Sequence, residues 1–343
     1  MSNSQPEGGR ASSPDVDGDM SRAIAEAARL ITGAGKLALA CHVSPDGDAL
    51  GSMLALHHLA LANGKPSLAS WPEPFVVAPH YQFLPGLDLV TKPADFPPDP
   101  EVMVTFDCGS VGRLGELGPI AERSRWVGRL VVLDHHASNE CYGSVNCVDP
   151  AAAATAVVVR RLATELGWPL NREAAMCLYT GLVTDTGRFQ YHNTTPAVFA
   201  LAEELSTFDL PICDMSRQLF EEHRFAYLKL VAVCLERAEL DVDLRFVATW
   251  VTDEDFQRFD VSIEETEGLI DLVRRAAEAE VSCVLKESPE GIRVSLRAVE
   301  ETDVGAIATR FGGGGHRFAA GFTSAGTVAE VLAQIRGALA TGG

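Results

Sequence analysis

Residues 37–48 of the chain read LALACHVSPDGD, an apolar run followed at once by a polar loop. The run 37–41 has the length and composition of a buried strand. Residues 50–62 follow with helical periodicity, and Asn63-Gly64 is a typical helix end. This order of strand, polar loop and helix is the repeating unit of α/β folds.

Two further segments repeat the start of this arrangement. Residues 102–106 form an apolar run that leads to Asp107, and residues 130–133 form one that leads to Asp134. Strands of this kind, alternating with helices, predict a doubly wound, mainly parallel sheet. Open α/β sheets bind their ligands beyond the carboxyl ends of the strands, so we expect the functional residues there.

The length of 343 residues and a change of pattern after about residue 196 predict two folded domains. The first 20 residues are rich in Ser, Gly, Pro and Asp, a composition typical of a disordered tail. The expected organisation is a disordered tail over 1–20, an α/β domain over 21–195, a helical linker over 196–235 and a smaller α+β domain over 236–343.

The charge and the apolar content limit the possible partners. The chain has 47 acidic and 28 basic residues and a formal net charge of −19, which disfavours long duplex nucleic acid because non-specific binding depends on Lys and Arg. No apolar run approaches the roughly 18 residues of a membrane span, and the N-terminus lacks a signal-peptide core. We therefore expect a cytoplasmic protein with eight reduced cysteines and no membrane partner.

Four separated segments supply side chains that bind hard or borderline metals. The candidate ligands are His42, Asp46, Asp48, Asp107, His135 and Asp185. Carboxylate and imidazole together suit Mn²⁺, Mg²⁺, Co²⁺ or Zn²⁺. Each segment alone has a structural explanation, such as the turn that Asp46-Gly47 favours, but four acidic clusters at one sheet edge would repel one another without cations. We expect two divalent cations, bridged by Asp107, that activate water beside a phosphate group.

In matching order, the four segments resemble the four motifs of the DHH phosphoesterase superfamily, from about residue 30 to 325. The resemblance implies a doubly wound catalytic domain and Mn²⁺ as the usual metal. It implies one metal held by His42, Asp46 and Asp107, and a second held by Asp48, Asp107, His135 and Asp185.

The expected catalytic residues are Asp107, Asp134 and His136. By the resemblance, His136 faces the substrate phosphate rather than a metal. We expect Asp134 to accept a hydrogen bond from His135 or His136 and so to fix its tautomer. His136 is then a candidate donor to a phosphate oxygen or to the leaving group.

Residues 312–321 read GGGGHRFAAG. Consecutive glycines expose backbone N–H groups that suit a phosphate cradle, although a flexible loop explains glycines alone equally well. Arg297 lies at the end of a predicted strand. Its guanidinium suits a bidentate contact with phosphate, or an ordinary ion pair. The candidate substrate-binding residues are Arg297, Gly313, Gly314, Gly315, His316, Arg113 and Arg188, of which the last two are otherwise ordinary surface charges.

The glycine run and residues 295–297 resemble the signature of the DHH-associated substrate-binding domain. The two domains together are similar to bacterial nano-RNases that also dephosphorylate 3′-phosphoadenosine 5′-phosphate. This implies an oligoribonuclease that cleaves short single-stranded RNA to mononucleotides and releases AMP and phosphate from the bisphosphate, in a family that often forms homodimers. A soluble cyclic-dinucleotide or linear-dinucleotide phosphodiesterase is the main alternative, and a non-catalytic nucleotide sensor is a third.

Overall fold

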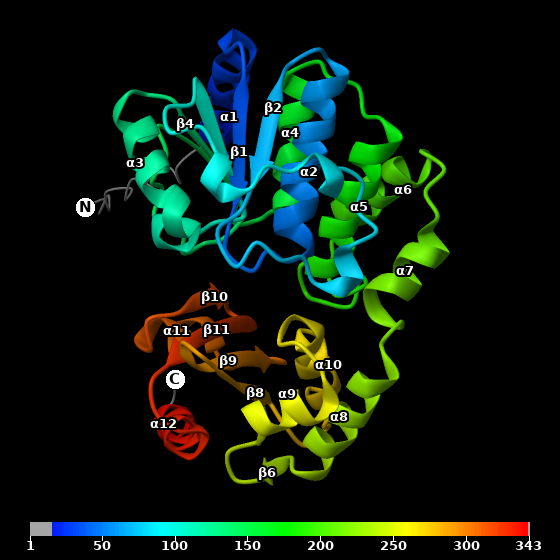
Figure 1. Cartoon of the computed structure of the whole chain (residues 1–343), viewed down its shortest axis with the longest axis vertical. Coiled ribbons are helices and arrows are strands. Elements are labelled where there is room, and N and C mark those ends of the chain that lie inside the picture. Colours follow the sequence, from blue (N-terminus) through cyan, green and yellow to red (C-terminus); the bar gives the residue numbers. More distant parts are fainter. Residues whose placement is uncertain (1–15, 342–343) are drawn as a thin grey trace, which may run out of the picture.

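The computed structural model describes residues 16–341, and a five-stranded, wholly parallel sheet forms the centre of its first domain (Figure 1). In spatial order the strands are β2 (Ser67–Ser70), β1 (Leu37–Cys41), β3 (Val102–Phe106), β4 (Leu130–Asp134) and β5 (Val145–Val148). The predicted doubly wound sheet is therefore confirmed. Strands β2 and β5 lacked a clear signal because they are short and carry polar residues such as Ser67 and Asn146.

Helices cover both faces of this sheet, which explains why its central strands read as continuous apolar runs. The helices are α1 (Val16–Gly33), α2 (Gly47–Ala62), α3 (Gly118–Trp126), α4 (Thr155–Glu165) and α5 (Arg172–Asp185), with 3₁₀ turns η1 (Pro79–Tyr81), η2 (Leu87–Leu89), η3 (Pro93–Asp95) and η4 (Val111–Leu117). Helices α1, α2, α4 and α5 share the larger core, which includes Leu39 and Phe106. Helix α3 and turn η4 pack on the other face, against Ala40 and Val132.

The second domain is a six-stranded mixed sheet, as expected for a smaller α+β domain. Its spatial order is β10 (Gly314–His316), β11 (Ala319–Ser324), β9 (Gly291–Ala298), β8 (Val281–Ser288), β7 (Phe246–Val251) and β6 (Glu239–Asp241). Only the pair β7–β8 is parallel. Its other elements are α9 (Asp253–Phe259), η5 (Glu264–Thr266), α10 (Leu269–Val273), α11 (Val304–Arg310) and α12 (Val328–Ala340).

Three helices occupy most of the expected linker, and they divide between the two domains. They are α6 (Pro196–Ser206), α7 (Ile212–Phe220) and α8 (Phe225–Glu236). Leu205 of α6 and Met215 of α7 are buried in the core of the first domain. Leu230 of α8 is buried in a core of the second domain. The chain therefore passes from one domain to the other between α7 and α8.

The expected disordered tail needs one correction. Residues 1–15 lie outside the described part of the chain, but residues 16–20 belong to α1. The helix extends this far because Met20 packs against the same core as Ile24 and Ile31, at helical spacing. Within residues 16–341, no helix combines the length and the apolar character that crossing a lipid bilayer requires.

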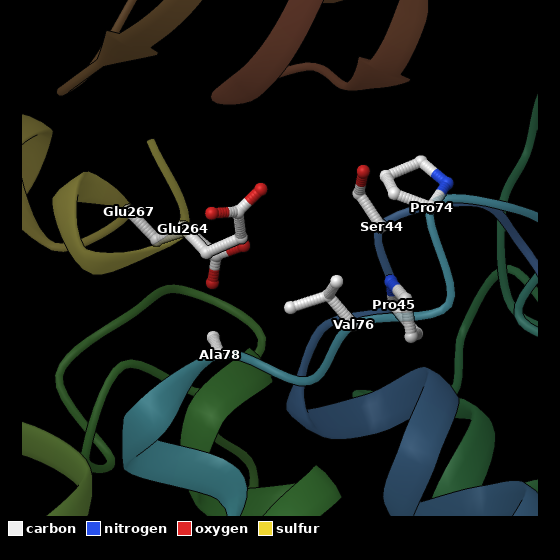
Figure 2. Close-up of a pocket in the computed structure, with 7 residues that line it drawn as sticks. All are labelled: Ser44, Pro45, Pro74, Val76, Ala78, Glu264 and Glu267. Carbon is white, nitrogen blue, oxygen red and sulfur yellow. The ribbon is translucent and has the colours of Figure 1, made fainter. Parts of the chain in front are cut away.

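The two domains contact each other at several points. The Tyr191 hydroxyl donates to Asp271 Oδ1 at 3.3 Å, and His80 Nε2 lies 3.5 Å from Glu267 Oε2. Figure 2 shows a small pocket at this boundary. Its lining comes from both domains and consists of Ser44, Pro45, Pro74, Val76, Ala78, Glu264 and Glu267. The loop after β1 therefore lies against the second domain.

Glycines set the spacing of α2 and α5, the two helices that carry Asp48 and Asp185. A Cβ atom on Gly51 of α2 would lie 2.4 Å from the Cys177 carbonyl oxygen of α5. A Cβ atom on Gly181 of α5 would lie 2.6 Å from Asp48 Oδ1. Neither helix can move away without opening the core, so both glycines are required for this packing.

We predict that Gly51→Ala destabilises the protein by about 1–3 kcal/mol, the usual cost of overpacking. Gly337→Ala in α12 is the matched control, because nothing lies within 4 Å of the added Cβ. The control should stabilise the protein by roughly 0.4–1 kcal/mol, because alanine lowers the conformational entropy of the unfolded chain. Thermal denaturation of both variants checks this, and an unchanged midpoint for Gly51→Ala would contradict the close-packing account.

Candidate metal-binding active site

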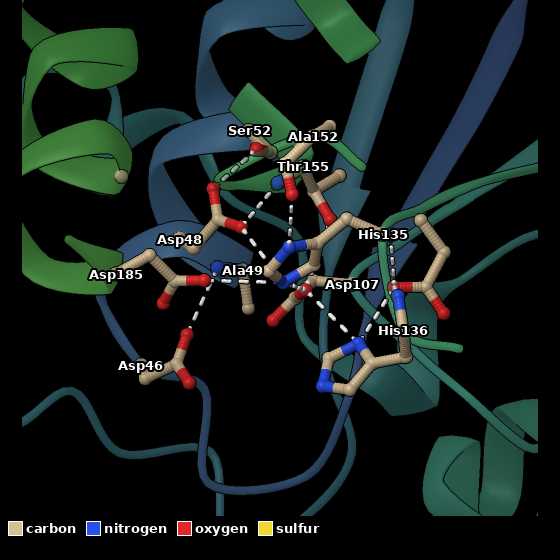
Figure 3. Close-up of polar contacts among 12 residues, drawn as sticks. Asp46, Asp48, Ala49, Ser52, Asp107, His135, His136, Ala152, Thr155 and Asp185 are labelled. Carbon is tan, nitrogen blue, oxygen red and sulfur yellow. Dashed lines mark hydrogen bonds and ion pairs between the residues drawn. The ribbon is translucent and has the colours of Figure 1, made fainter. Parts of the chain in front are cut away.

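The carboxyl ends of three neighbouring strands and the ends of two helices bring the candidate ligands together, and Figure 3 labels all of these ligands except His42. His42 follows β1, Asp107 follows β3 and His135 follows β4. Asp46 is the N-cap of α2, and Asp48 lies in the first turn of that helix. Asp185 lies in the last turn of α5. All six residues predicted from the sequence therefore reach one region.

Asp107 lies at the centre of this group. Its Oδ2 is 3.6 Å from His42 Nε2, and its Oδ1 is 3.4 Å from His135 Nε2. The side chain is buried, and the residue has a φ of 53°, a left-handed conformation that Asp tolerates better than most residues. Thr155 Oγ1 donates to Oδ1 at 2.9 Å. The carboxylate is thus fixed between two imidazoles.

Two overlapping groups of ligand atoms share Asp107. In the first, His42, Asp46 and Asp107 offer atoms within 4.8 Å of one another. In the second, Asp48, Asp107 and His135 do the same. Asp185 adjoins the second group, because its Oδ2 lies 3.1 Å from His135 Nε2. This division matches the two ligand sets that the resemblance implies.

Both imidazoles present a free nitrogen to these carboxylates. His42 Nε2 and His135 Nε2 are buried and have no hydrogen-bond partner. On the opposite side of each ring, Nδ1 lies near a backbone carbonyl oxygen, at 2.8 Å from Val43 and at 3.2 Å from Ala152. A proton held on Nδ1 leaves the Nε2 lone pair available for a metal.

The electrostatics of the site also call for cations. Burial, together with the neighbouring Asp107 and Asp185, raises the pKa of the Asp48 carboxyl well above its usual range. Burial lowers the pKa of His135, but Asp107 and Asp185 outweigh it and raise that pKa well above its ordinary value. Buried carboxylates with unsatisfied imidazoles are the donor set that divalent cations prefer. The described residues therefore fit a pair of divalent ions.

Asp48 is held by three further donors. Ser52 Oγ and the Ala156 N–H donate to its Oδ1, each at 3.0 Å, and the Thr155 N–H donates to its Oδ2 at 2.5 Å. Sequence reasoning missed Thr155, which supports both Asp48 and Asp107 from the start of α4. The signal was the run of alanines at 151–154, whose small side chains allow this helix start to approach the strand ends.

Asp134 fixes His136 rather than the ring of His135. Its Oδ1 lies 2.7 Å from His136 Nδ1 and accepts the backbone N–H groups of His135 and His136. The amide of Asn139, which the sequence did not single out, donates to Oδ2. His136 is therefore oriented by a buried carboxylate, with its Nε2 left free to meet a ligand.

The second domain reaches the same region through His316. Its ring stacks on His136 at 4.3 Å with an interplanar angle of 15°, and it lies 4.6 Å from the His135 ring. Burial, with His136 and His135 nearby, lowers the pKa of His316 to about 3. The imidazole of His316 is accordingly neutral in this arrangement.

The glycine run, expected as a phosphate cradle or a flexible loop, is partly an edge strand that begins at Gly314. Residues 314–316 form β10 and pair with β11. Close packing explains two of the glycines, because a Cβ on Gly313 would lie 2.2 Å from the Gly321 carbonyl oxygen, and one on Gly315 would lie 2.5 Å from that of Ala319. Nothing lies within 4 Å of a Cβ placed on Gly314.

The three candidate arginines differ in their surroundings. Arg297, on β9, donates only to the Leu296 carbonyl oxygen at 3.1 Å, and its buried Nε has no partner. Arg113 Nη2 lies 3.0 Å from His42 Nδ1, so this cation is beside the ligand group. Arg188 stacks over Phe220 of α7, 4.8 Å from the ring centre. Arg113 is therefore in contact with the ligand group, whereas the guanidinium of Arg188 makes no hydrogen bond or ion pair with the described residues.

Comparison with known proteins agrees with this geometry. Residues 36–182 match the DHH family N-terminal domain, and residues 244–341 match the DHHA1 domain. The chain is 31% identical over 308 residues to the bifunctional oligoribonuclease and PAP phosphatase NrnA of Thermus thermophilus, covering 89% of this chain and 88% of that protein. It is 25% identical to the Bacillus subtilis protein of the same name, over 82% of this chain and 86% of the relative.

A solved structure shows the same fold. The crystal structure of an exopolyphosphatase-related protein from Bacteroides fragilis superposes with a TM-score of 0.84 at 26% identity, over 94% of this chain and 96% of that chain. The two domains thus follow each other along the chain, the DHH domain first and the DHHA1 domain second. The chain belongs to the DHH family of phosphoesterases and carries a DHHA1 domain in its C-terminal part.

Proposed function

We propose that this phosphoesterase hydrolyses short oligoribonucleotides to mononucleotides and removes the 3′-phosphate from 3′-phosphoadenosine 5′-phosphate, leaving AMP. The names of the relatives support these two substrates. The observation that carries the proposal is the Asp107 carboxylate between His42 Nε2 and His135 Nε2, with a separate set of acids on each side. Such a shared carboxylate suits a two-metal phosphoesterase.

The residues divide into three tasks. The six ligand residues would hold two divalent ions, for which we propose Mn²⁺, with Mg²⁺ or Co²⁺ as substitutes. Bound there, such ions lower the pKa of water and neutralise charge on phosphate oxygens. His136, oriented by Asp134, is placed to give a proton to the nucleoside 3′-oxygen as its bond to phosphorus breaks.

The second domain would bind the remainder of the substrate. Strands β9 and β10 flank β11. Arg297 of β9 and His316 of β10 both pair with the same residue of β11, Ala319. A phosphate held there lies at a fixed reach from the ligand group, because His316 contacts His136 across the boundary. We infer that this fixed reach selects nucleotides with two phosphates one nucleoside apart.

We predict that Asp107→Asn reduces hydrolysis of both substrates at saturating Mn²⁺ by at least about 100-fold, since loss of a group that merely supports a ligand costs roughly 10–100-fold. Asn tolerates the left-handed backbone at this position. Asp95→Asn, at an exposed site on η3, is the control and should keep full turnover. Wild-type turnover by a folded Asp107→Asn protein would disprove the two-metal assignment.

We predict that Arg297→Ala raises KM for both substrates roughly 10–100-fold, because a charged hydrogen bond to phosphate contributes about 1.5–3 kcal/mol. We expect kcat to change much less, since this contact is made equally before and during the reaction. Arg310→Ala, at the exposed end of α11, is the control. Steady-state kinetics separates these effects, and a fall in kcat with KM unchanged would remove Arg297 from substrate binding.

A further inference from the structure

A row of basic side chains extends beyond Arg297 on one face of the β8–β9 hairpin. Lys286 of β8 is directly opposite Arg293 of β9 in the antiparallel register, so the two side chains share a face. Arg293 and Arg297 also share that face, because they are separated by an even number of residues. At the usual rise, their Cα atoms lie roughly 13 Å apart along the strand.

These cations have no anionic partner among the described residues. Lys286 is only 7% exposed, yet it makes neither a hydrogen bond nor an ion pair. The Arg293 guanidinium likewise makes neither. Like charges directly opposite each other on neighbouring strands are destabilising, and a buried charge is stable only when paired. The arrangement would therefore be stabilised by an anion.

The nearby acids do not supply that anion. The charges of Glu267 and Glu264 favour the charged form of Lys286, but neither acid forms an ion pair with it. Glu267 instead lies 3.5 Å from His80 of the first domain. Burial lowers the pKa of Lys286 to about 8, opposed by Glu267 and reinforced by Arg293 and Arg297, so the ammonium is still mostly charged at neutral pH.

The row lies at the boundary between the domains. At one end, Arg297 and His316 both pair with Ala319, and His316 stacks on His136. At the other end, Lys286 lies near Glu264 and Glu267, which face the loop after β1 across the boundary in Figure 2. An anion that extends along the hairpin from Arg297 would thus meet Arg293 and Lys286 next.

We propose that Lys286 and Arg293 form a second phosphate-binding position, which takes the 5′-terminal phosphate of a trinucleotide. The inference rests on the proposed function and deepens it. A 5′-phosphorylated dinucleotide, like 3′-phosphoadenosine 5′-phosphate, carries two phosphates, which occupy the ligand group and Arg297. A 5′-phosphorylated trinucleotide carries one more, which reaches Lys286. The hairpin therefore distinguishes RNA of three nucleotides from shorter substrates.

The test compares three substrates on the full-length protein with Mn²⁺: 3′-phosphoadenosine 5′-phosphate and 5′-phosphorylated RNA of two and of three nucleotides. Lys286→Met keeps the length of the side chain and removes its charge. We expect KM for the trinucleotide to rise about tenfold, with kcat unchanged, and KM for the two shorter substrates to stay within about twofold. Lys229→Met, on the exposed face of α8, is the control and should change none of these values.

Arg293→Gln, on the partly exposed strand β9, provides a second variant that does not alter a buried side chain. It should reproduce the trinucleotide-specific rise in KM. An equal rise for all three substrates, or no change for the trinucleotide in either variant, would overturn the proposal. If the wild-type protein hydrolyses none of the substrates, the proposed function fails. The affinity of labelled trinucleotide for the wild type and for Lys286→Met, measured by fluorescence anisotropy, then tests the second phosphate-binding position by itself.

Discussion

The geometry of the protein depends on one buried carboxylate that two imidazoles share. Asp107 is 2% exposed, and its two oxygens face His42 and His135 on opposite sides. Burial alone would raise the pKa of this carboxyl, but His136, His135 and His42 outweigh burial and lower it well below its ordinary value. The residue is therefore ionised inside the protein, where only further positive charge can balance the other acids nearby.

The rest of the first domain keeps this carboxylate in place. Three parallel strands end at the same edge of the sheet, so His42, Asp107 and His135 meet without any long loop. Helices α2 and α5 approach each other through Gly51 and Gly181, which brings Asp48 and Asp185 to the same side of His135. The DHHA1 domain then covers the site with His316. The packing of the backbone therefore sets the distances between the ligand side chains.

Most of the first domain was predictable because each of its central strands is an apolar run that ends at an acidic or imidazole side chain. The parts that were not predictable depend on contacts between distant segments. Strand β10 reads as a loop because glycine has no strand preference, and only its pairing with β11 explains Gly313 and Gly315. Thr155 was missed because its contacts with Asp48 and Asp107 cross more than forty residues of sequence.

The decisive observation is whether a metal ion binds next to each oxygen of the Asp107 carboxylate. Anomalous scattering from crystals of the full-length protein grown with Mn²⁺ would locate the ions directly. The account predicts two peaks, one beside His42 and Asp46 and one beside His135 and Asp185, with an Asp107 oxygen next to each. A single peak that does not touch Asp107, or no peak near these residues, would contradict it.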